Sequence, residues 1–368
     1  MSPSLPHSPT VSIMMPAYNA ERFIALAIES VLKQSFSDWE LLIVNDGSTD
    51  RTRETAAGFQ DARILLIDQT NSGEAAARNT ALQHVRGRYL AFLDSDDLYQ
   101  PEHLKLTLNY LDTHSEKDAV YTDGIHCDQD GNLLKPLSSR RRGPFEGNLF
   151  EQVVRASDVF GPPMVVVLRS EAVFQRKLHF DPSIVIGPDW DFFTHYAEHA
   201  NFGYLPVQTC IYRVHQTNIS VTTGLPRRRG YMAICRTKAI KLPRFNELNL
   251  ETRTAVFYDL LINLFHGQPD KQLEATLWPE FIRLPTSDQA RLLRLMASKA
   301  IQRGLRNKYI TDWLQRAMHL NPADRKSMLI YGLFRVHPTL SQKFLNLRTA
   351  GQIDPLDISP FADLYEND

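Results

Sequence analysis

Short apolar runs and amphipathic windows alternate along the first half of the chain. Each apolar run is followed by polar or turn residues, a pattern typical of buried strands. The four predicted strands are Val11–Met15, Glu40–Val44, Arg63–Ile67 and Arg88–Leu93. Between them, apolar residues recur at helical spacing. The three predicted helices are Glu21–Gln34, Gly73–Val85 and Pro101–Leu111. This strand–helix alternation predicts an α/β fold with a doubly wound, mostly parallel sheet.

Beyond residue 118 the pattern becomes less regular, and beyond residue 222 it changes character. The intermediate part predicts strands at Asp118–Thr122 and Met164–Leu168 and a helix at Trp190–His199. After Thr222-Thr223-Gly224 helical windows follow one another with almost no strand pattern. We therefore predict a disordered N-terminus at residues 1–9, an α/β domain at 10–224 and an all-helical extension at 225–368.

Charge and composition exclude several classes of protein. The formal net charge of −1 over 368 residues gives no overall field that attracts nucleic acid, and we expect no such partner. Three scattered cysteines suit neither a disulfide framework nor a zinc site, which favours a reducing compartment. The N-terminus lacks the features of a signal peptide, and no stretch reaches the ~18 apolar residues of a membrane span. We expect a cytoplasmic protein, with contact at the inner face of the membrane left open.

Polar segments follow the four strands of the first half, where ligands of such sheets bind. They are Pro16-Ala17-Tyr18-Asn19, Asn45-Asp46-Gly47-Ser48, Asn71-Ser72-Gly73 and Asp94-Ser95-Asp96-Asp97. The last is the most informative, because three carboxylates within four residues repel one another unless a cation lies between them. Asp94 and Asp96 point to the same side of an extended segment and offer oxygen ligands for a hard divalent ion. A helix N-cap explains one aspartate but not three.

Two further motifs lie downstream, Asp189-Trp190-Asp191 and Tyr212-Arg213-x-His215-x-x-Asn218-x-Ser220. With the strand-end segments and Ala77-Arg78-Asn79, they resemble the family 2 inverting glycosyltransferases of the GT-A fold. The resemblance covers about residues 10–222, and the helical remainder shows none. It implies a metal-dependent hexosyltransferase that uses Mn²⁺ or Mg²⁺. It also implies a nucleotide-sugar donor, expected to be a UDP-sugar, and a glycan or lipid-linked acceptor in surface polysaccharide or glycoconjugate synthesis.

The resemblance implies a donor and metal site built from the strand ends. Tyr18 would pack against the nucleobase, and Asp46 would accept a hydrogen bond from it, most naturally from the imide N–H of uracil. Asp96 and His215 would hold the metal. The implied donor-binding residues are Pro16, Tyr18, Asn19, Asp46, Arg78, Asp94, Ser95, Arg213 and Ser220.

On the acceptor side, the resemblance implies that Asp189 is the general base. Asp191 is the fallback, because Pro188 stands where an acidic residue often precedes the base. Trp190 would line the acceptor pocket. The residues by themselves leave simpler interpretations open: Asp189 as a helix N-cap, Trp190 as part of the core, and His215 as an ordinary surface histidine.

Two other classes of protein stay open. A catalytically inactive nucleotide-sugar-binding or scaffold protein could keep the same fold, although the intact Asp94-Ser95-Asp96 and Asp189 favour an enzyme. A nucleotidyltransferase shares the sheet type and the metal dependence. Such enzymes usually carry a Gly-rich, basic phosphate loop after the first strand, and Pro16-Ala17-Tyr18-Asn19 is not one.

Overall fold

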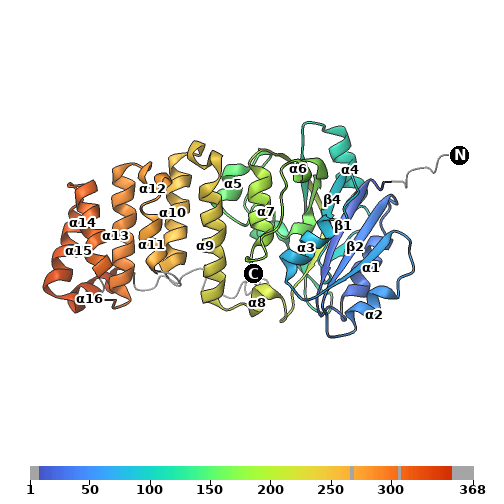
Figure 1. Ribbon diagram of the computed structural model, residues 1–368, viewed down its shortest axis with the longest axis horizontal. Helices are drawn as coiled ribbons and strands as arrows, with labels where there is room; N and C mark the ends of the chain where they lie inside the picture. The colour runs from blue at the N-terminus through green and yellow to red at the C-terminus, as the bar shows by residue number, and fades with distance from the viewer. Residues whose placement is uncertain (1–7, 266–268, 306–307, 350–368) are drawn as a thin grey trace. The chain divides into compact units, whose positions relative to one another are not determined.

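The computed structural model describes residues 8–265, 269–305 and 308–349, which divide into two compact units (Figure 1). Among these residues, unit 1 runs to Thr222 and unit 2 begins at Thr223, close to the boundary expected at 224. Residues 1–7 of the predicted disordered N-terminus and residues 350–368 of the predicted extension lie outside the described residues.

Unit 1 is built around one sheet. Its described strands are β1 (Val11–Ala17), β2 (Trp39–Asp46), β3 (Ile64–Gln69), β4 (Tyr89–Phe92), β5 (Leu98–Tyr99), β6 (Ala119–Cys127), β7 (Leu133–Pro136), β8 (Gly147–Asn148), β9 (Val166–Arg169) and β10 (Asn201–Arg213). They lie in the order β3-β2-β1-β4-β9-β6-β10-β5, with β7 beside β6 and β8 beside β10. The four strands predicted in the first half are confirmed as β1 to β4, with their ends shifted by at most two residues.

The sheet is mixed, and parallel pairing holds in only part of it. Strands β3, β2, β1 and β4 pair in parallel, as do β6 and β10. Strand β9 runs antiparallel between β4 and β6, and β5, β7 and β8 add further antiparallel pairs. The expectation of a mostly parallel sheet therefore fits the first half of the domain. It fails at β9, because that strand follows the short turn η2 (Pro163–Val165) and not a crossover helix.

Helices cover the strands of unit 1. They are α1 (Ile24–Leu32), α2 (Thr52–Ala57), α3 (Glu74–Leu82), α4 (His103–Thr113), η1 (Leu137–Arg140), α5 (Phe150–Arg155), α6 (Ser170–Gln175), α7 (Pro188–Ala197) and α8 (Ile219–Thr222). Helix α3 packs on β1 and β2, and α4 packs on β6 and β10. Helix α1 begins at Ile24 and not at the predicted Glu21, because the N–H groups of Phe23 and Ile24 close a turn on the Ala20 carbonyl.

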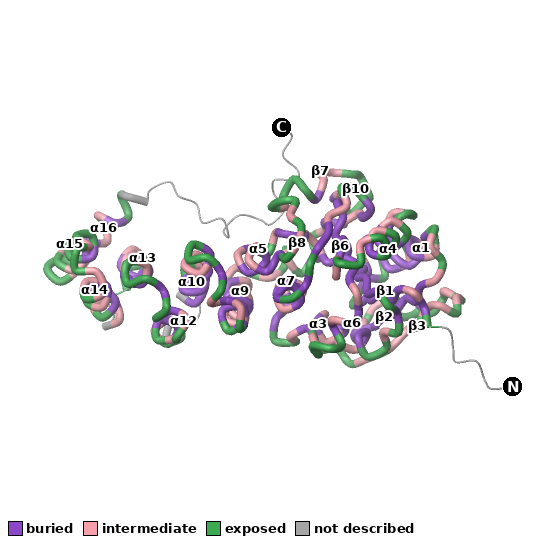
Figure 2. The backbone as a smooth tube through the Cα atoms, turned by 90° about the horizontal axis from the view of Figure 1, so that it is seen from above, coloured by how far each residue is buried: buried purple, intermediate pink, exposed green. Residues whose placement is uncertain are grey.

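Unit 2 consists of helices, and its described residues contain no strand, which confirms the expected helical extension. The helices are α9 (Leu225–Lys241), η3 (Pro243–Glu247), α10 (Leu250–Phe265), α11 (Pro269–Ala275), α12 (Pro279–Ile282), α13 (Thr286–Gln302), α14 (Lys308–Leu320), α15 (Arg325–Val336) and α16 (Pro338–Thr349). The apolar stripe of α10, which includes Val256, Leu260 and Leu261, is buried (Figure 2, purple). Among the described helices of the chain, none is long and apolar enough to span a bilayer.

Candidate active site

The polar segments that follow β1, β2, β3 and β4 gather at one edge of the sheet. These four strands pair in parallel, so their carboxyl ends point the same way. Strand β1 ends at Ala17, β2 at Asp46, β3 at Gln69 and β4 at Phe92. The segments singled out in the sequence therefore begin side by side.

Asp46 holds the turn into helix α3. Its Oδ1 accepts hydrogen bonds from the Ser72 N–H at 2.8 Å and from Gln69 Nε2 at 2.7 Å. Its Oδ2 accepts from the Gly73 N–H at 2.8 Å. Gly73 has φ +88°, a left-handed conformation that favours glycine, and it opens α3. Oδ2 keeps a second acceptor position, the one that a nucleobase N–H would need.

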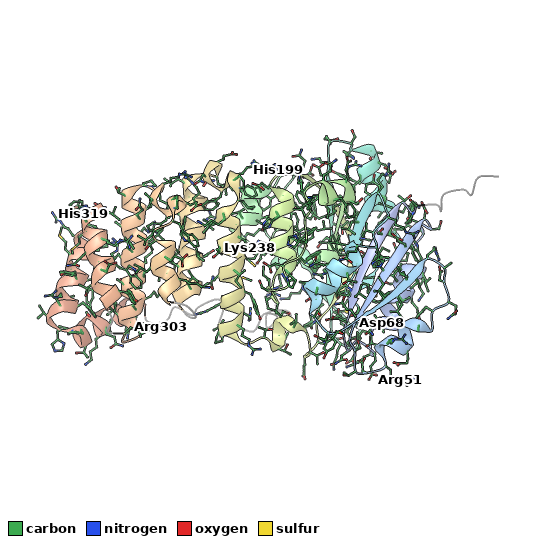
Figure 3. The ribbon with its side chains drawn as sticks, viewed as in Figure 1. Arg51, Asp68, His199, Lys238, Arg303 and His319 are labelled. Atoms are coloured by element: carbon green, nitrogen blue, oxygen red, sulfur yellow. The ribbon has the colours of Figure 1, made fainter. Side chains whose placement is uncertain are left out.

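Asn19 and Asn45 tie together neighbouring segments at this edge of the sheet. The Asn19 N–H donates to Ser48 Oγ at 3.1 Å, and Asn19 Oδ1 accepts from the Thr49 N–H at 2.8 Å. Asn45 Nδ2 donates to Asp68 Oδ1 at 2.9 Å, and Asp68 is labelled on β3 in Figure 3. Asn19 thus anchors the loop after β1 to the loop after β2, a structural role that accompanies its expected place in the donor site.

Pro16 and Tyr18 lie at the end of β1. The carbonyls of Thr10 and Met14 accept hydrogen bonds from β4 and the residue after it, so the even-numbered residues of β1 face that strand. Pro16 comes after Met14, the last residue of β1 paired with β4, and its missing N–H therefore costs no ladder bond. Tyr18 is 50% exposed. An exposed ring at the edge of the sheet suits stacking against a planar ligand.

Arg78 is a buried cation held between two carboxylates. It is 1% exposed, and its Nη2 lies 2.6 Å from Asp94 Oδ1. Its Nη1 lies 2.6 Å from Oε1 of Glu74, one helical turn earlier in α3. Burial raises the pKa of Asp94, with Asp96 and Asp189 adding to the shift and Arg78 opposing it. Burial likewise raises the pKa of Glu74, to about 7. The negative charge at this site thus exceeds what one arginine balances.

His215 returns from the end of β10 to contact the aspartate segment. Its Nε2 lies 2.8 Å from Asp96 Oδ2, and its backbone N–H donates to Asn218 Oδ1 at 2.5 Å. Asn218 Nδ2 also reaches Asp96 Oδ2 at 3.4 Å. The interpretation of His215 as an ordinary surface histidine is wrong, because its ring is bonded to one of the carboxylates of the candidate site.

Arg213 makes its hydrogen bonds to neighbouring groups of the protein. Its backbone N–H donates to Asp97 Oδ1 at 2.8 Å, and its Nε and Nη1 donate to the carbonyls of Asp96 and Asp128 at 3.0 and 3.3 Å. Among the described residues, Asp97 Oδ2 is buried without a hydrogen-bond partner, and burial raises the pKa of Asp97 well above its usual range. Contact of Arg213 with a diphosphate would require these carbonyl bonds to be exchanged.

The remaining two residues of the expected donor set lie beside these groups. Ser95 is buried between the two aspartates of the segment after β4. The hydroxyl of Ser220, in α8, hydrogen-bonds the side chain of Tyr212. Ser95 is thus less accessible to a ligand than Tyr18, whereas Ser220 is only partly buried.

An aromatic cluster brings helix α7 to the end of β4. The ring of Phe180 stacks on that of Phe192 at 4.4 Å, and both contact Phe92 edge-on. Asn79 of α3 adds two bonds to the backbone of Phe180, donating to its carbonyl at 2.7 Å and accepting from its N–H at 2.8 Å. These contacts explain why Asp189, in the first turn of α7, interacts electrostatically with the carboxylates after β4.

The three residues of the Asp-Trp-Asp motif have different surroundings. Asp189 lies within α7, whose N-cap is Gly187, so the N-cap interpretation of Asp189 is wrong. Its carboxylate makes no hydrogen bond to the described residues and faces the positive end of the helix dipole. Asp191 is buried at 2% exposure, 3.7 Å from His195 Nδ1. Trp190 donates its indole N–H to the Val153 carbonyl at 2.8 Å and is buried, which supports the interpretation as a core residue; its expected place beside the acceptor stays a prediction.

The side chains of Asp96 and His215 fit a divalent cation that also binds a substrate. Asp96 Oδ2 and His215 Nε2 lie 2.8 Å apart, close to the ~3.0 Å that separates neighbouring ligands of an octahedral ion with bonds of ~2.1 Å. No group of three or more His, Cys, Asp or Glu side chains among the described residues forms a complete cage. Two protein ligands suit Mg²⁺ or Mn²⁺, which commonly keep positions for water and phosphate oxygens.

The fold matches solved glycosyltransferase structures. S. aureus TarS (residues 1–349, in complex with UDP-GlcNAc) superposes with a TM-score of 0.56 at 16% identity, covering 89% of this chain and 92% of TarS. The mannosyltransferase PcManGT from Pyrobaculum calidifontis, in complex with GDP-Man and Mn²⁺, gives 0.51 at 20% identity and covers 88% of each chain. The GT-A-type fold is thereby confirmed. A coverage of 89% also extends past unit 1, so the helical part has a counterpart that its sequence did not indicate.

The sequence model of glycosyl transferase family 2 matches residues 12–173. These residues form a family 2 glycosyltransferase domain. A UDP-Glc:alpha-D-GlcNAc-diphosphoundecaprenol beta-1,3-glucosyltransferase from Escherichia coli is 48% identical over 27% of this chain and 40% of its own length. Chondroitin synthase from Escherichia coli is 36% identical over 38% of this chain and 22% of its own length. The chain thus matches less than half the length of these curated relatives.

Three residues of the candidate site make contacts that sequence reasoning did not assign. Glu74 pairs with Arg78, Asp97 receives the Arg213 N–H, and Asn218 joins His215 to Asp96. The i,i+4 spacing of Glu74 and Arg78 was a usable signal, since such pairs face each other on a helix. Asp97 and Asn218 had no comparable signal, because Asp97 meets the end of β10 and Asn218 meets the aspartate segment, 116 and 122 positions away along the chain.

Glu74→Gln should flatten the pH dependence of stability. The pKa of Glu74 rises from 4.5 to about 7 on folding, so the folded state keeps a proton that the unfolded chain has released within this window. Stability therefore falls as pH rises from about 4.5 to 7. Urea unfolding without divalent ions should show a shallower fall for Glu74→Gln. The control is Glu29→Gln, which breaks an exposed i,i+4 pair with Lys33. Equal slopes for wild type and Glu74→Gln would contradict the assignment.

Proposed function

We propose that the chain transfers a hexose, with inversion, from a UDP-sugar to a hydroxyl group of a glycan or lipid-linked acceptor. The observation that carries this proposal is the cluster of Glu74, Asp94, Asp96 and Asp189 around the buried cation Arg78. Unbalanced carboxylates at the carboxyl ends of parallel strands are costly in a structural role and useful for a cation-assisted reaction. A scaffold protein has no need to keep them.

In the proposed reaction, Asp189 is the general base that takes the proton of the acceptor hydroxyl. The acceptor O–H loses its proton to the Asp189 carboxylate while the acceptor oxygen bonds to the anomeric carbon of the sugar. The bond from that carbon to the diphosphate breaks, and its electron pair stays on the departing UDP. Inversion needs one base opposite the leaving group, which one free carboxylate supplies. A hydrolase of the two-carboxylate type would need an acid and a base flanking the bond.

The leaving-group side is assigned to residues of the strand ends. A divalent cation held by Asp96 and His215 would neutralise the negative charge that develops on the diphosphate. Asn218 positions His215 through the bond to its backbone N–H. Arg78 fixes Asp94, which is expected to face the ribose.

The names of two relatives support the proposed acceptor class. One relative is named as acting on a diphosphoundecaprenol-linked sugar and another as chondroitin synthase. The first of these names describes a lipid-linked saccharide acceptor. We therefore favour a sugar hydroxyl of a glycan or lipid-linked saccharide in surface polysaccharide synthesis, over a nucleotidyl or protein acceptor.

UDP-sugars should stabilise the protein more than GDP- or dTDP-sugars in the presence of Mn²⁺. At ~100-fold excess over Kd, binding should raise Tm by about 5–10 °C. Tyr18→Ala should remove most of this shift and leave the unliganded Tm unchanged, because Tyr18 is half exposed. Phe174→Ala, which removes another exposed aromatic ring, should keep it. A larger shift with guanosine or thymidine donors would contradict the uridine assignment, and absence of transfer to any saccharide would contradict the proposed activity.

A further inference from the structure

Helices α15 and α16 expose several apolar side chains on surfaces that are normally polar in a helix facing solvent. The exposed apolar side chains are Met328, Leu329, Val336, Leu340 and Leu347. Their spacing of seven or eight positions within each helix puts them on one side of that helix. Val336 is 85% exposed and Leu347 is 79% exposed, so most of each side chain contacts solvent. Together with Arg325, Arg335 and Lys343, which are exposed on the same helices, they form what we call the basic–apolar surface.

Helix α13 of the same unit shows what an ordinary solvent-facing stripe looks like here. Its exposed residues are Thr286, Ser287, Arg291 and Lys299, all polar. Its apolar side chains, such as Leu293 and Met296, are buried. The apolar exposure of α15 and α16 is therefore not shared by the solvent-facing stripe of α13.

All the formal charge on this surface is positive. Residues 325–349 contain five Lys or Arg and no Asp or Glu. The carboxylate nearest in sequence, Asp324, caps α15 by accepting from the Lys326 N–H and is ion-paired with Arg294. It is thus not available to balance the basic side chains of the surface.

We propose that the basic–apolar surface binds an anionic lipid bilayer. Helices that lie in a membrane interface bury an apolar stripe at the headgroup boundary and place Lys and Arg against anionic headgroups. A second copy of the chain is a poorer occupant, because a two-fold contact would bring identical positive stripes together. The inference does not rest on the proposed function, since lipid binding is measured without donor or acceptor.

The test is vesicle flotation with the full chain. Wild-type protein should float with vesicles of phosphatidylcholine and phosphatidylglycerol, and not with phosphatidylcholine alone. High salt should release it, because screening weakens the attraction between exposed charges. Arg335→Gln with Lys343→Gln should weaken binding by about 30-fold, since each basic side chain near an anionic surface contributes about fivefold. Val336→Ser with Leu347→Ser should weaken it by about tenfold or more.

Matched controls come from the same unit. Arg291→Gln with Lys299→Gln removes two exposed charges from α13, and Leu277→Ser with Ile282→Ser removes two exposed apolar side chains. Both controls should bind as wild type, and circular dichroism should show every variant folded. The proposal is overturned if wild type does not float, or if the controls lose as much binding as the test variants. It is also overturned if the test variants dissociate a dimer while flotation is unchanged.

Discussion

Replacing Asp96 by alanine should lower the rate of sugar transfer by about 10³-fold or more. Asp96 Oδ2 and His215 Nε2, which lie 2.8 Å apart, are the two proposed ligand atoms of the cation, and stabilising the charge on a departing diphosphate is worth several kcal/mol. The fold should survive the substitution. The loss of the bonds to His215 and Asn218 costs about 1 kcal/mol each. This loss of stability is offset in part, because removing the Asp96 carboxylate also removes its repulsion of the charged forms of Asp94 and Asp97.

The matched control is Asp130→Ala, which removes an exposed aspartate paired with Arg22 at 3.2 Å. Initial rates with a UDP-sugar and a saccharide acceptor, together with Tm, provide the comparison. His215→Gln should show a smaller loss than Asp96→Ala, because it removes one ligand and keeps the carboxylate. Full activity of the wild type in excess chelator would contradict the metal assignment, even if Asp96→Ala were inactive for another reason.

Asp189→Asn should lower the rate constant of transfer by about 10²–10⁴-fold, the contribution of a positioned general base. The amide keeps the shape of the side chain in the first turn of α7 and removes its basicity. Stability should change little, because the lost attraction to the helix N-terminus, about 0.3–1 kcal/mol, is countered by weaker repulsion of Glu74 and Asp94. The donor-induced shift of Tm should be retained, since Asp189 acts on the acceptor.

The substitution Asp191→Asn distinguishes Asp189 from Asp191 as the general base. Asp191 is buried beside His195 and has no surface for an acceptor, so its substitution should lower Tm more than it lowers the rate in the folded protein. The opposite pattern, an active Asp189→Asn and an inactive but folded Asp191→Asn, would place the base two residues later. If both variants are active, neither aspartate is the base.

Much of the candidate site could be predicted because it follows strands of simple pattern. Apolar runs identified β1 to β4, and in a parallel sheet the residues after such strands must meet at one edge. Tyr18, Asp46 and Asp94 lie at the ends of these strands or within two residues of them, so their proximity is a consequence of the strand pattern alone. The chemistry of these side chains, carboxylates and an exposed ring, follows from residue type.

Other features could not be predicted, because packing decides them and local pattern does not. The burial of Trp190, whose indole N–H donates to the Val153 carbonyl of α5, is one of them. The direction of β9 could not be predicted, since an apolar run marks a buried strand without indicating which neighbour it pairs with or in which sense. The antiparallel pairings of β5 and β8 could not be predicted for the same reason.

By itself, the sequence determined the strand ends, the residue types gathered there and the helical nature of the second unit, because these depend on periodicity over a few residues. Only the tertiary structure decided which distant groups meet. His215 reaches Asp96 across 119 positions, and the Arg213 N–H reaches Asp97 across 116. The rings of Phe92, Phe180 and Phe192 bring Asp189 to the aspartate segment. Periodicity marks a face to be buried but not its partner, and the partner is selected by close packing and by satisfaction of buried polar groups.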